Sequence, residues 1–454
     1  MTIAGNLAEY VNSMRYEDLD EKVIHEAKRR IIDALGCSIG AFNAEPVRIV
    51  REMAKNVAGK KSATILCTKY KTTPELAAFV NTTMSRYLDF MDTYFYNGEY
   101  VHPEDNLGSI LAVAEAEERT GKDVILSTIL AYEACCRLAE FANIRKRGWD
   151  HVIWLTISSA AAVSRLMELP TDKIAEAISI GVVSNIPLRQ IRVGGLSMWK
   201  GLAVAYATMS GVFASNLARN GITGPSEIFE GKHGFFNQIA GKSDLSIDKF
   251  CRQGEKFKIS EVHIKKYPAE YNSLSAIEAA FEVRNRIKKI DDIKEINIHT
   301  FTAGYEIIAD KDKWYPANRE TADHSLPYIV CAALVDGEIT EKQFSMKRIS
   351  DPELRALVQK VNVYPSEECD KDYYPGTPSI VEVVTKSGEK YSSKVIHPRG
   401  SYRNPMSDGE LEEKFKDLVK RHLTPKQIQS GLKRIWNLEK EKNISKLISS
   451  FTVR

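Results

Sequence analysis

The chain has 454 residues, 43% of them hydrophobic and 27% charged, which is typical of a folded globular protein with more than one core. The 63 basic and 60 acidic residues leave a net charge of +3, which argues against general binding to nucleic acid. Seven cysteines without a CxxC pair argue against a zinc knuckle, a dithiol redox site or an iron–sulfur cluster. We therefore expect no metal, no cofactor and reduced, buried thiols in the cytoplasm.

The first 250 residues predict one helix after another. Residues 21–35 place apolar side chains on one face, and Gly36 is expected to end that helix. Thr73 and Pro74 have the cap and first-turn residues of a helix start. Further helices are expected at 103–119, ended by Gly121, and at 123–140, 152–167, 171–183 and 197–220.

Residues 201–218 carry no charge and are nearly long enough to span a membrane. Ala, Ser, Thr and Gly dominate the stretch, so a closely packed core helix is the better interpretation and we expect no membrane partner. The first 22 residues include early acids and no long apolar run, which argues against a signal peptide.

Beyond residue 262 the pattern changes. Residues 293–301 alternate as a strand, and 380–396 predict a hairpin around Gly388, with helices at 271–286 and 324–334. Capping signals at Ser407 and Thr424 open the last helices. The sequence thus predicts a mainly α protein, with a large all-helical domain from 1–262 and 401–454 and a smaller α+β domain at 263–400.

Three histidines stand in polar segments just before apolar helices, where reactive groups collect. His102 precedes a helix N-terminus that favours an anion, with a capping role as the alternative. His151 follows Asp150, which could hold its imidazole, although sequence neighbours often point apart. His324 has the same setting, again with capping as the alternative.

The candidate cationic residues lie at the start of the uncharged helix and just before it in the sequence. Lys200 stands at its start and needs a partner or an anionic ligand, unless its ammonium group reaches solvent. Arg189 and Arg192 lie just upstream. No phosphate-binding loop, GxSxG or HExxH motif occurs in the chain, so the residues alone indicate a helical enzyme with a histidine and lysine site for an anion.

Several segments resemble the MmgE/PrpD family, which includes 2-methylcitrate dehydratases. They follow one another along nearly the whole chain: IDALGCSIGA (32–41), LDFMDT (88–93), HPEDNLGSILAVAEA (102–116), GWDHVIWLTISSAAAVSRL (148–166), SMWKGLAVAYATMSGVFASNLARNGITGP (197–225), KYPAEYNSLSAIEAA (266–280), KWYPANRETADHSLPYIV (313–330) and HPRGSYRNPMS (397–407). The sequence departs from the best-known dehydratases at Asn272 and Ser273.

The resemblance implies an all-helical domain with an α+β lid, in a homodimer that works without metal or iron–sulfur cluster. It also implies a hydro-lyase that dehydrates 2-methylcitrate, and also citrate, to the corresponding cis-aconitate. A cis-aconitate decarboxylase or an iminodisuccinate-type epimerase on the same fold is the alternative among enzymes, and a helical ligand-binding or scaffold protein is the alternative outside them. We expect catalytic roles for Asp89, His102, His151 and Lys200, and substrate-binding roles for Thr93, Arg189, Arg192, Lys266 and His324.

Overall fold

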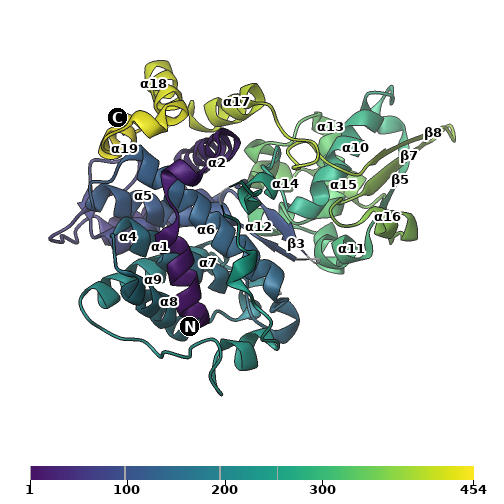
Figure 1. The fold of residues 1–454 in the computed structure, drawn as a ribbon. Helices are drawn as coiled ribbons and strands as arrows, with labels where there is room; N and C mark the ends of the chain where they lie inside the picture. The colour runs from purple at the N-terminus through teal and green to yellow at the C-terminus, as the bar shows by residue number, and fades with distance from the viewer. Residues whose placement is uncertain (1, 97–98, 194–195, 253, 454) are drawn as a thin grey trace. The chain divides into compact units, whose positions relative to one another are not determined.

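The chain forms two compact units in a computed structural model that describes residues 2–96, 99–193, 196–252 and 254–453. The first unit comprises Met1–Ile264 and Ser407–Arg454, and the second comprises Lys265–Met406 (Figure 1). Helices build the first unit, and the second combines helices with a four-stranded sheet. The expectation of a mainly α protein with a smaller α+β part is confirmed.

The first unit holds the longest helices of the described chain. These are α1 (Ile3–Ser13), α2 (Glu21–Gly40), α3 (Glu45–Ala54), α4 (Pro74–Tyr87), α5 (Leu107–Ala116), α6 (Gly121–Phe141), α7 (Ile153–Leu166), α8 (Thr171–Ser184), α9 (Trp199–Arg219), α17 (Asp408–Val419), α18 (Pro425–Trp436) and α19 (Ser445–Ser450). The sequence predicted an all-helical unit, but the unit is not entirely helical. Two short antiparallel pairs interrupt it, β1 (Ala63–Thr64) with β2 (Lys71–Thr72) and β3 (Tyr94–Tyr96) with β4 (Glu99–Val101).

The expected helix starts at Thr73 and Ser407 are confirmed. The Thr73 hydroxyl accepts a hydrogen bond from the backbone N–H of Leu76, and Pro74 is the first residue of α4. Ser407 and Glu410 form the reciprocal capping box at α17. These signals are local, so they operate wherever the helix finally packs.

Two expected helix ends are wrong. Helix α2 continues through Gly36 to Gly40, because the residues after Gly36 are buried and packing outweighs its poor propensity. A Cβ at Gly36 would lie 3.2 Å from Cδ2 of Phe415, so the glycine lets α17 approach closely. Gly121 opens α6 after the cap residue Thr120, and the preceding segment is a 3-10 turn, η2 (Pro103–Asn106), followed by α5.

Helix α9 packs against α4, α7 and α8 in the first unit (Figure 1). A Cβ at Gly211 would lie 2.8 Å from the backbone nitrogen of Ala160, so only glycine permits this approach of α9 to α7. Among the described residues α9 alone is long and apolar enough to cross a membrane, yet 56% of its most apolar window is buried inside the protein. Burial of this extent is typical of a core helix in a globular unit. The rest of the α9 surface forms one exposed face.

The C-terminal helices return to the start of the chain. Lys414 on α17 lies with its Nζ 2.6 Å from Oδ1 of Asp33 on α2, and it donates to the carbonyl oxygen of Phe90 at 2.8 Å. Both charged side chains are buried, so each supplies the charge that the other needs. The contact also fixes the backbone beside Asp89.

The second unit is built on a four-stranded sheet in the order β6-β5-β7-β8. The strands are β5 (Ile293–Thr300), β6 (Val361–Pro365), β7 (Ser379–Thr385) and β8 (Lys390–Val395); β6 is parallel to β5 and the other pairs are antiparallel. The helices are α10 (Leu274–Arg284), α11 (Thr302–Ile308), α12 (Arg319–Ala322), α13 (Leu326–Asp336), α14 (Met346–Ile349), α15 (Pro352–Val358) and α16 (Glu367–Asp372).

The expected strand and hairpin of the second unit are confirmed, and β6 was missed. Alternate residues of β5 and β7 are buried against α10 and α13, which share one apolar cluster with them. Strand β6 has only Val361 and Val363 as buried apolar residues, and it ends in Pro365. So short a pattern becomes a strand only through its pairing with β5.

Candidate active site

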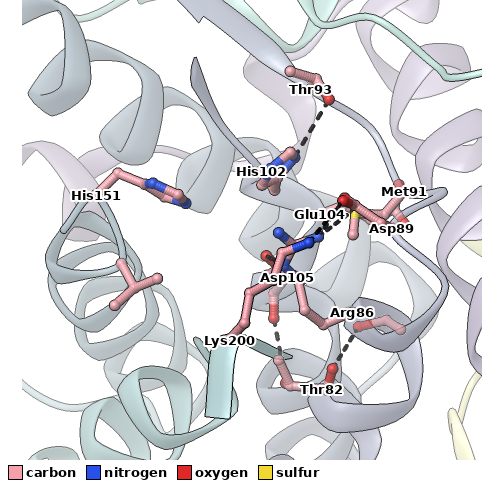
Figure 2. A network of polar contacts seen from close by, with 12 residues as sticks. Thr82, Arg86, Asp89, Met91, Thr93, His102, Glu104, Asp105, His151 and Lys200 are labelled. Carbon is pink, nitrogen blue, oxygen red and sulfur yellow. Dashed lines mark hydrogen bonds and ion pairs between the residues drawn. The ribbon is translucent and has the colours of Figure 1, made fainter. Parts of the chain in front are cut away.

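Asp89 occupies a left-handed bend directly after α4. Its φ is +51°, a conformation in which a non-glycine residue is uncommon. Its carboxylate accepts from Nη1 of Arg86 at 2.8 Å and lies with Oδ2 3.3 Å from Nζ of Lys200 at the start of α9 (Figure 2). All three side chains are buried. One carboxylate thus faces two desolvated cations. The three side chains together keep one positive charge, which can bind an anion.

Asp105 lies on the other side of Arg86. Its Oδ2 is 4.0 Å from Nε of Arg86, and the residue is 1% exposed. Burial raises the pKa of Asp105 to about 7, although the neighbouring guanidinium opposes the shift. Near neutral pH this carboxyl group therefore exists in both protonation states, and it can hold a proton beside the cations.

His102 lies between β4 and the turn η2, and its side chain makes no capping hydrogen bond. Its Nδ1 lies 2.7 Å from the carbonyl oxygen of Asp92 and 3.3 Å from Oγ1 of Thr93. A carbonyl only accepts, so this contact puts a proton on Nδ1 and makes Nε2 the nitrogen that can exchange a proton with a ligand. Thr93 is fixed in turn by two 2.8 Å backbone hydrogen bonds to His263. The capping alternative for His102 is wrong.

His151 faces His102 from the segment before α7. The two ring centroids lie 5.8 Å apart (Figure 2). The Tyr100 ring lies within 6.3 Å of both. Burial lowers the pKa of His151 to about 3, and Arg192 and Arg189 act in the same direction, whereas Asp150 opposes the shift. His151 is therefore neutral at physiological pH, the state in which an imidazole can accept a proton.

Asp150 brings the two upstream arginines to His151. Its buried carboxylate accepts from Nε of Arg192 at 2.8 Å and from Nη2 of the same residue at 3.3 Å, and it lies 3.6 Å from Nη1 of Arg189. These cations hold the pKa of Asp150 well below its usual range, although burial alone would raise it. The ion pairs join the turn η4 (Arg189–Arg192) to the start of α7 and put a surplus of positive charge beside His151.

The remaining two expected site residues belong to the second unit. Nδ1 of His324 pairs with Oδ1 of Asp323, and the carbonyl oxygen of Asp323 accepts from the backbone of Glu270. The side chain of Glu270 accepts from the backbone and the side-chain amide of Asn272. Asn272 is thus held in place by its own loop. Lys266 is half-buried in the same unit.

The first unit therefore brings together Asp89, Thr93, His102, His151, Lys200, Arg189 and Arg192, as Figure 2 shows for the first five. Sequence reasoning missed Arg86 and Asp105. A signal existed for Arg86, because it is a charged residue one turn before Asp89, and the only other charged residue of that helix, Glu75, lies in its first turn. No pattern indicated Asp105, because its role depends on burial under Arg86.

A helical unit that surrounds two imidazoles with paired cations and carboxylates has the groups for acid–base chemistry on an anion. The chain belongs to the MmgE/PrpD family: the N-terminal domain of that family matches residues 5–248, and its C-terminal domain matches residues 267–438. The resemblance of the sequence to this family is confirmed.

Relatives with different reactions are equally similar to the chain. A mitochondrial 2-methylcitrate dehydratase of Yarrowia lipolytica is 28% identical over 443 residues, 91% of this chain and 83% of that protein. The 2-methylcitrate dehydratase of Salmonella typhimurium is 29% identical over 455 residues, 93% and 91% of the two chains. The cis-aconitate decarboxylase of Homo sapiens is 27% identical over 458 residues, which are 96% of this chain and 92% of that protein.

Proposed function

We propose that the protein is a hydro-lyase that removes water from 2-methylcitrate to give 2-methyl-cis-aconitate, and that it also accepts citrate. The observation that carries the proposal is the charge balance of the site. Four cations (Arg86, Arg189, Arg192 and Lys200) face the carboxylates of Asp89 and Asp150. A third carboxyl group, that of Asp105 beside Arg86, is partly protonated near neutral pH and offsets only part of the remaining charge. This surplus of positive charge suits a substrate with three carboxylates, and two named dehydratases among the relatives support the choice.

The reaction needs a base, an acid and a clamp for negative charge. The base takes a proton from the carbon next to a carboxylate, and the C–H electron pair becomes the second bond of the alkene. The C–O bond breaks, and hydroxide leaves as water with a proton from the acid. Of the pair His102 and His151, one imidazole takes the carbon-bound proton in its neutral form, and the other gives a proton to the leaving hydroxide in its imidazolium form. Lys200 with Arg189 and Arg192 holds the carboxylates as charge develops.

Asp89 orients the ammonium group of Lys200, and Thr93 binds substrate through its hydroxyl beside His102. We also propose that Lys266 and His324, which belong to the second unit, bind substrate. Lys266→Ala and His324→Gln are each expected to raise KM more than they lower kcat. A matched change at Lys342, an exposed lysine of the same unit, should leave both constants unaltered.

The experiment is an ultraviolet assay of the new conjugated double bond, with chelator-treated protein and 2-methylcitrate, citrate and cis-aconitate in parallel. Absorbance that rises on 2-methylcitrate supports the proposal, and the citrate trace defines its breadth. Consumption of cis-aconitate with release of carbon dioxide would instead identify a decarboxylase, the alternative that the human relative favours. No change on any of the three substrates would contradict both.

We also propose that the protein works as a homodimer through the exposed face of α9. Trp199, Tyr206 and Phe213 are spaced by seven residues and therefore share one side of the helix. They are 45%, 43% and 54% exposed, which is unusual for three large aromatic side chains in a row. Phe213→Glu should convert a dimer to a monomer in light scattering, whereas Ile49→Glu on α3 should not. A wild-type monomer would contradict the proposal.

We place the protein in the cytoplasm. All seven cysteines lie in the described part of the chain, and they are buried without a disulfide, as suits a reducing compartment. The mitochondrial relative gives the alternative location. Fractionation of source cells with an antibody to the chain tests the proposal, and recovery from an organelle pellet would overturn it.

A further inference from the structure

The two histidines of the site differ in what faces their Nδ1 atoms. The Nδ1 atom of His102 lies 2.7 Å from the backbone carbonyl oxygen of Asp92. The Nδ1 atom of His151 lies 3.6 Å from the carboxylate oxygen Oδ1 of Asp150. A carbonyl offers a partial charge, but a carboxylate offers a full one. Once the neighbouring arginines are neutralised, an imidazole that gains a proton in the reaction is therefore better stabilised at His151.

Asp150 cannot move to suit other partners. Besides its arginine contacts, its Oδ1 accepts from the backbone N–H of Val152 at 3.2 Å, and its own N–H donates to the carbonyl oxygen of Pro187 at 3.0 Å. The residue is 0% exposed. Arg192 holds the carboxylate through two nitrogens, a geometry that fixes orientation as well as charge.

We propose, resting on the function proposed above, that Asp150 is the positioning residue that makes His151 the base, and that a bound polycarboxylate activates it. Before substrate binds, Arg192 and Arg189 balance Asp150, and His151 carries no charge. The carboxylates of the substrate then neutralise the arginines, and Asp150 acts on His151 with its full charge. His151 accepts the carbon-bound proton, and Asp150 stabilises the imidazolium.

The charged and titratable groups around His151 fix the direction of each effect. Asp150 favours its protonated form, and Arg192, Arg189 and Arg86 disfavour it; the rings of Tyr100 and His102 also lie beside it. Loss of Asp150 should therefore keep His151 neutral at still lower pH. Loss of Arg192 should have the opposite effect, because it removes a cation and also leaves Asp150 less compensated.

The test is nuclear magnetic resonance of the whole protein labelled with ¹³C at histidine, where His151→Gln identifies the His151 signal. In the wild type this signal should stay at its neutral position on mild acidification. Arg192→Gln should raise the pKa of His151 by about one unit or more, and Asp150→Asn should not raise it. Propane-1,2,3-tricarboxylate, which has no hydroxyl group to lose, should raise it in the wild type.

A kinetic test separates positioning from folding. Asp150→Asn should lower kcat by about tenfold or more with KM changed less than about threefold, and Asp150→Glu should restore part of the loss. Glu133→Gln is the matched control, because Glu133 is equally buried and pairs with Arg137 in the same unit. It should leave kcat and the His151 signal unchanged.

Two results would overturn the inference. One is a His151 signal whose titration is the same in the wild type and Arg192→Gln and does not respond to the tricarboxylate. The other is an Asp150→Asn variant with wild-type kcat. The resonance experiment needs no turnover. A lack of dehydratase activity would therefore contradict the proposed function, whereas the titration of His151 would still decide this inference.

Discussion

Replacement of Lys200 by Met tests the carboxylate clamp most directly. The side chain keeps its length and loses its charge. A unit charge interacts with another about 4 Å away by about 4 kcal/mol at an effective dielectric constant of about 20. Asp89 lies 3.3 Å from Nζ and offsets part of that charge, so we take roughly half as the lower limit. A loss of about 2 to 4 kcal/mol lowers kcat/KM by about 30- to 1000-fold.

The same change should affect folding only modestly. Removal of one partner from a buried ion pair usually costs about 3 to 5 kcal/mol, because a bare charge stays behind. Asp89 keeps the Arg86 hydrogen bond at 2.8 Å, so we expect the free energy of unfolding to fall by less than about 2 kcal/mol. Urea unfolding measures this quantity, and the ultraviolet assay measures kcat/KM.

Lys258→Met is the matched control. The Lys258 side chain is 12% exposed against 11% for Lys200, and its Nζ lies 2.9 Å from both Glu140 and Glu261 in the same unit. It should retain kcat/KM. Near-normal kcat/KM in Lys200→Met would contradict the clamp, and an equal loss in Lys258→Met would attribute the effect to general destabilisation.

Three further variants test other parts of the site and fold. His102→Gln should lower kcat by about 100-fold or more with little change in KM, because a positioned proton-transfer group is lost; unchanged kcat would exclude His102 from the chemistry. Lys414→Met should lower the free energy of unfolding by about 3 to 5 kcal/mol in urea titrations, because it strands the buried carboxylate of Asp33; a loss below about 1 kcal/mol would show that the pair is not needed. Asp105→Asn tests pH linkage. The folded pKa of Asp105 is about 7, above its unfolded value, so Asp105 stabilises the fold at low pH and this contribution is lost as pH rises through about 7. The free energy of unfolding of the variant minus that of the wild type should therefore be more positive at about pH 8 than at about pH 5. The same difference at both pH values would exclude this linkage.

Local signals in the sequence were enough for much of the secondary structure. The starts of α4 and α17 and the hairpin of β7 and β8 follow from caps, periodicity and a turn glycine, all of which act within a few residues. Tertiary packing decided where α2 ends, because the burial of residues 37–39 outweighs the low helix propensity of Gly36. It also decided that β6 is a strand, because only pairing with β5 compensates so short an apolar pattern.

The sequence by itself determined the family, and it singled out the histidines and three of the four cations of the candidate site (Lys200, Arg189 and Arg192), because these residues stand at recognisable places in recognisable segments. Only the tertiary structure decided how they pair. Residues far apart in the chain meet where α9 packs on α4, so Lys200 finds Asp89 and Arg86 there. Burial then sets the charge of His151, because the cost of desolvating an ion depends on the whole surrounding fold and not on neighbouring residues in the sequence.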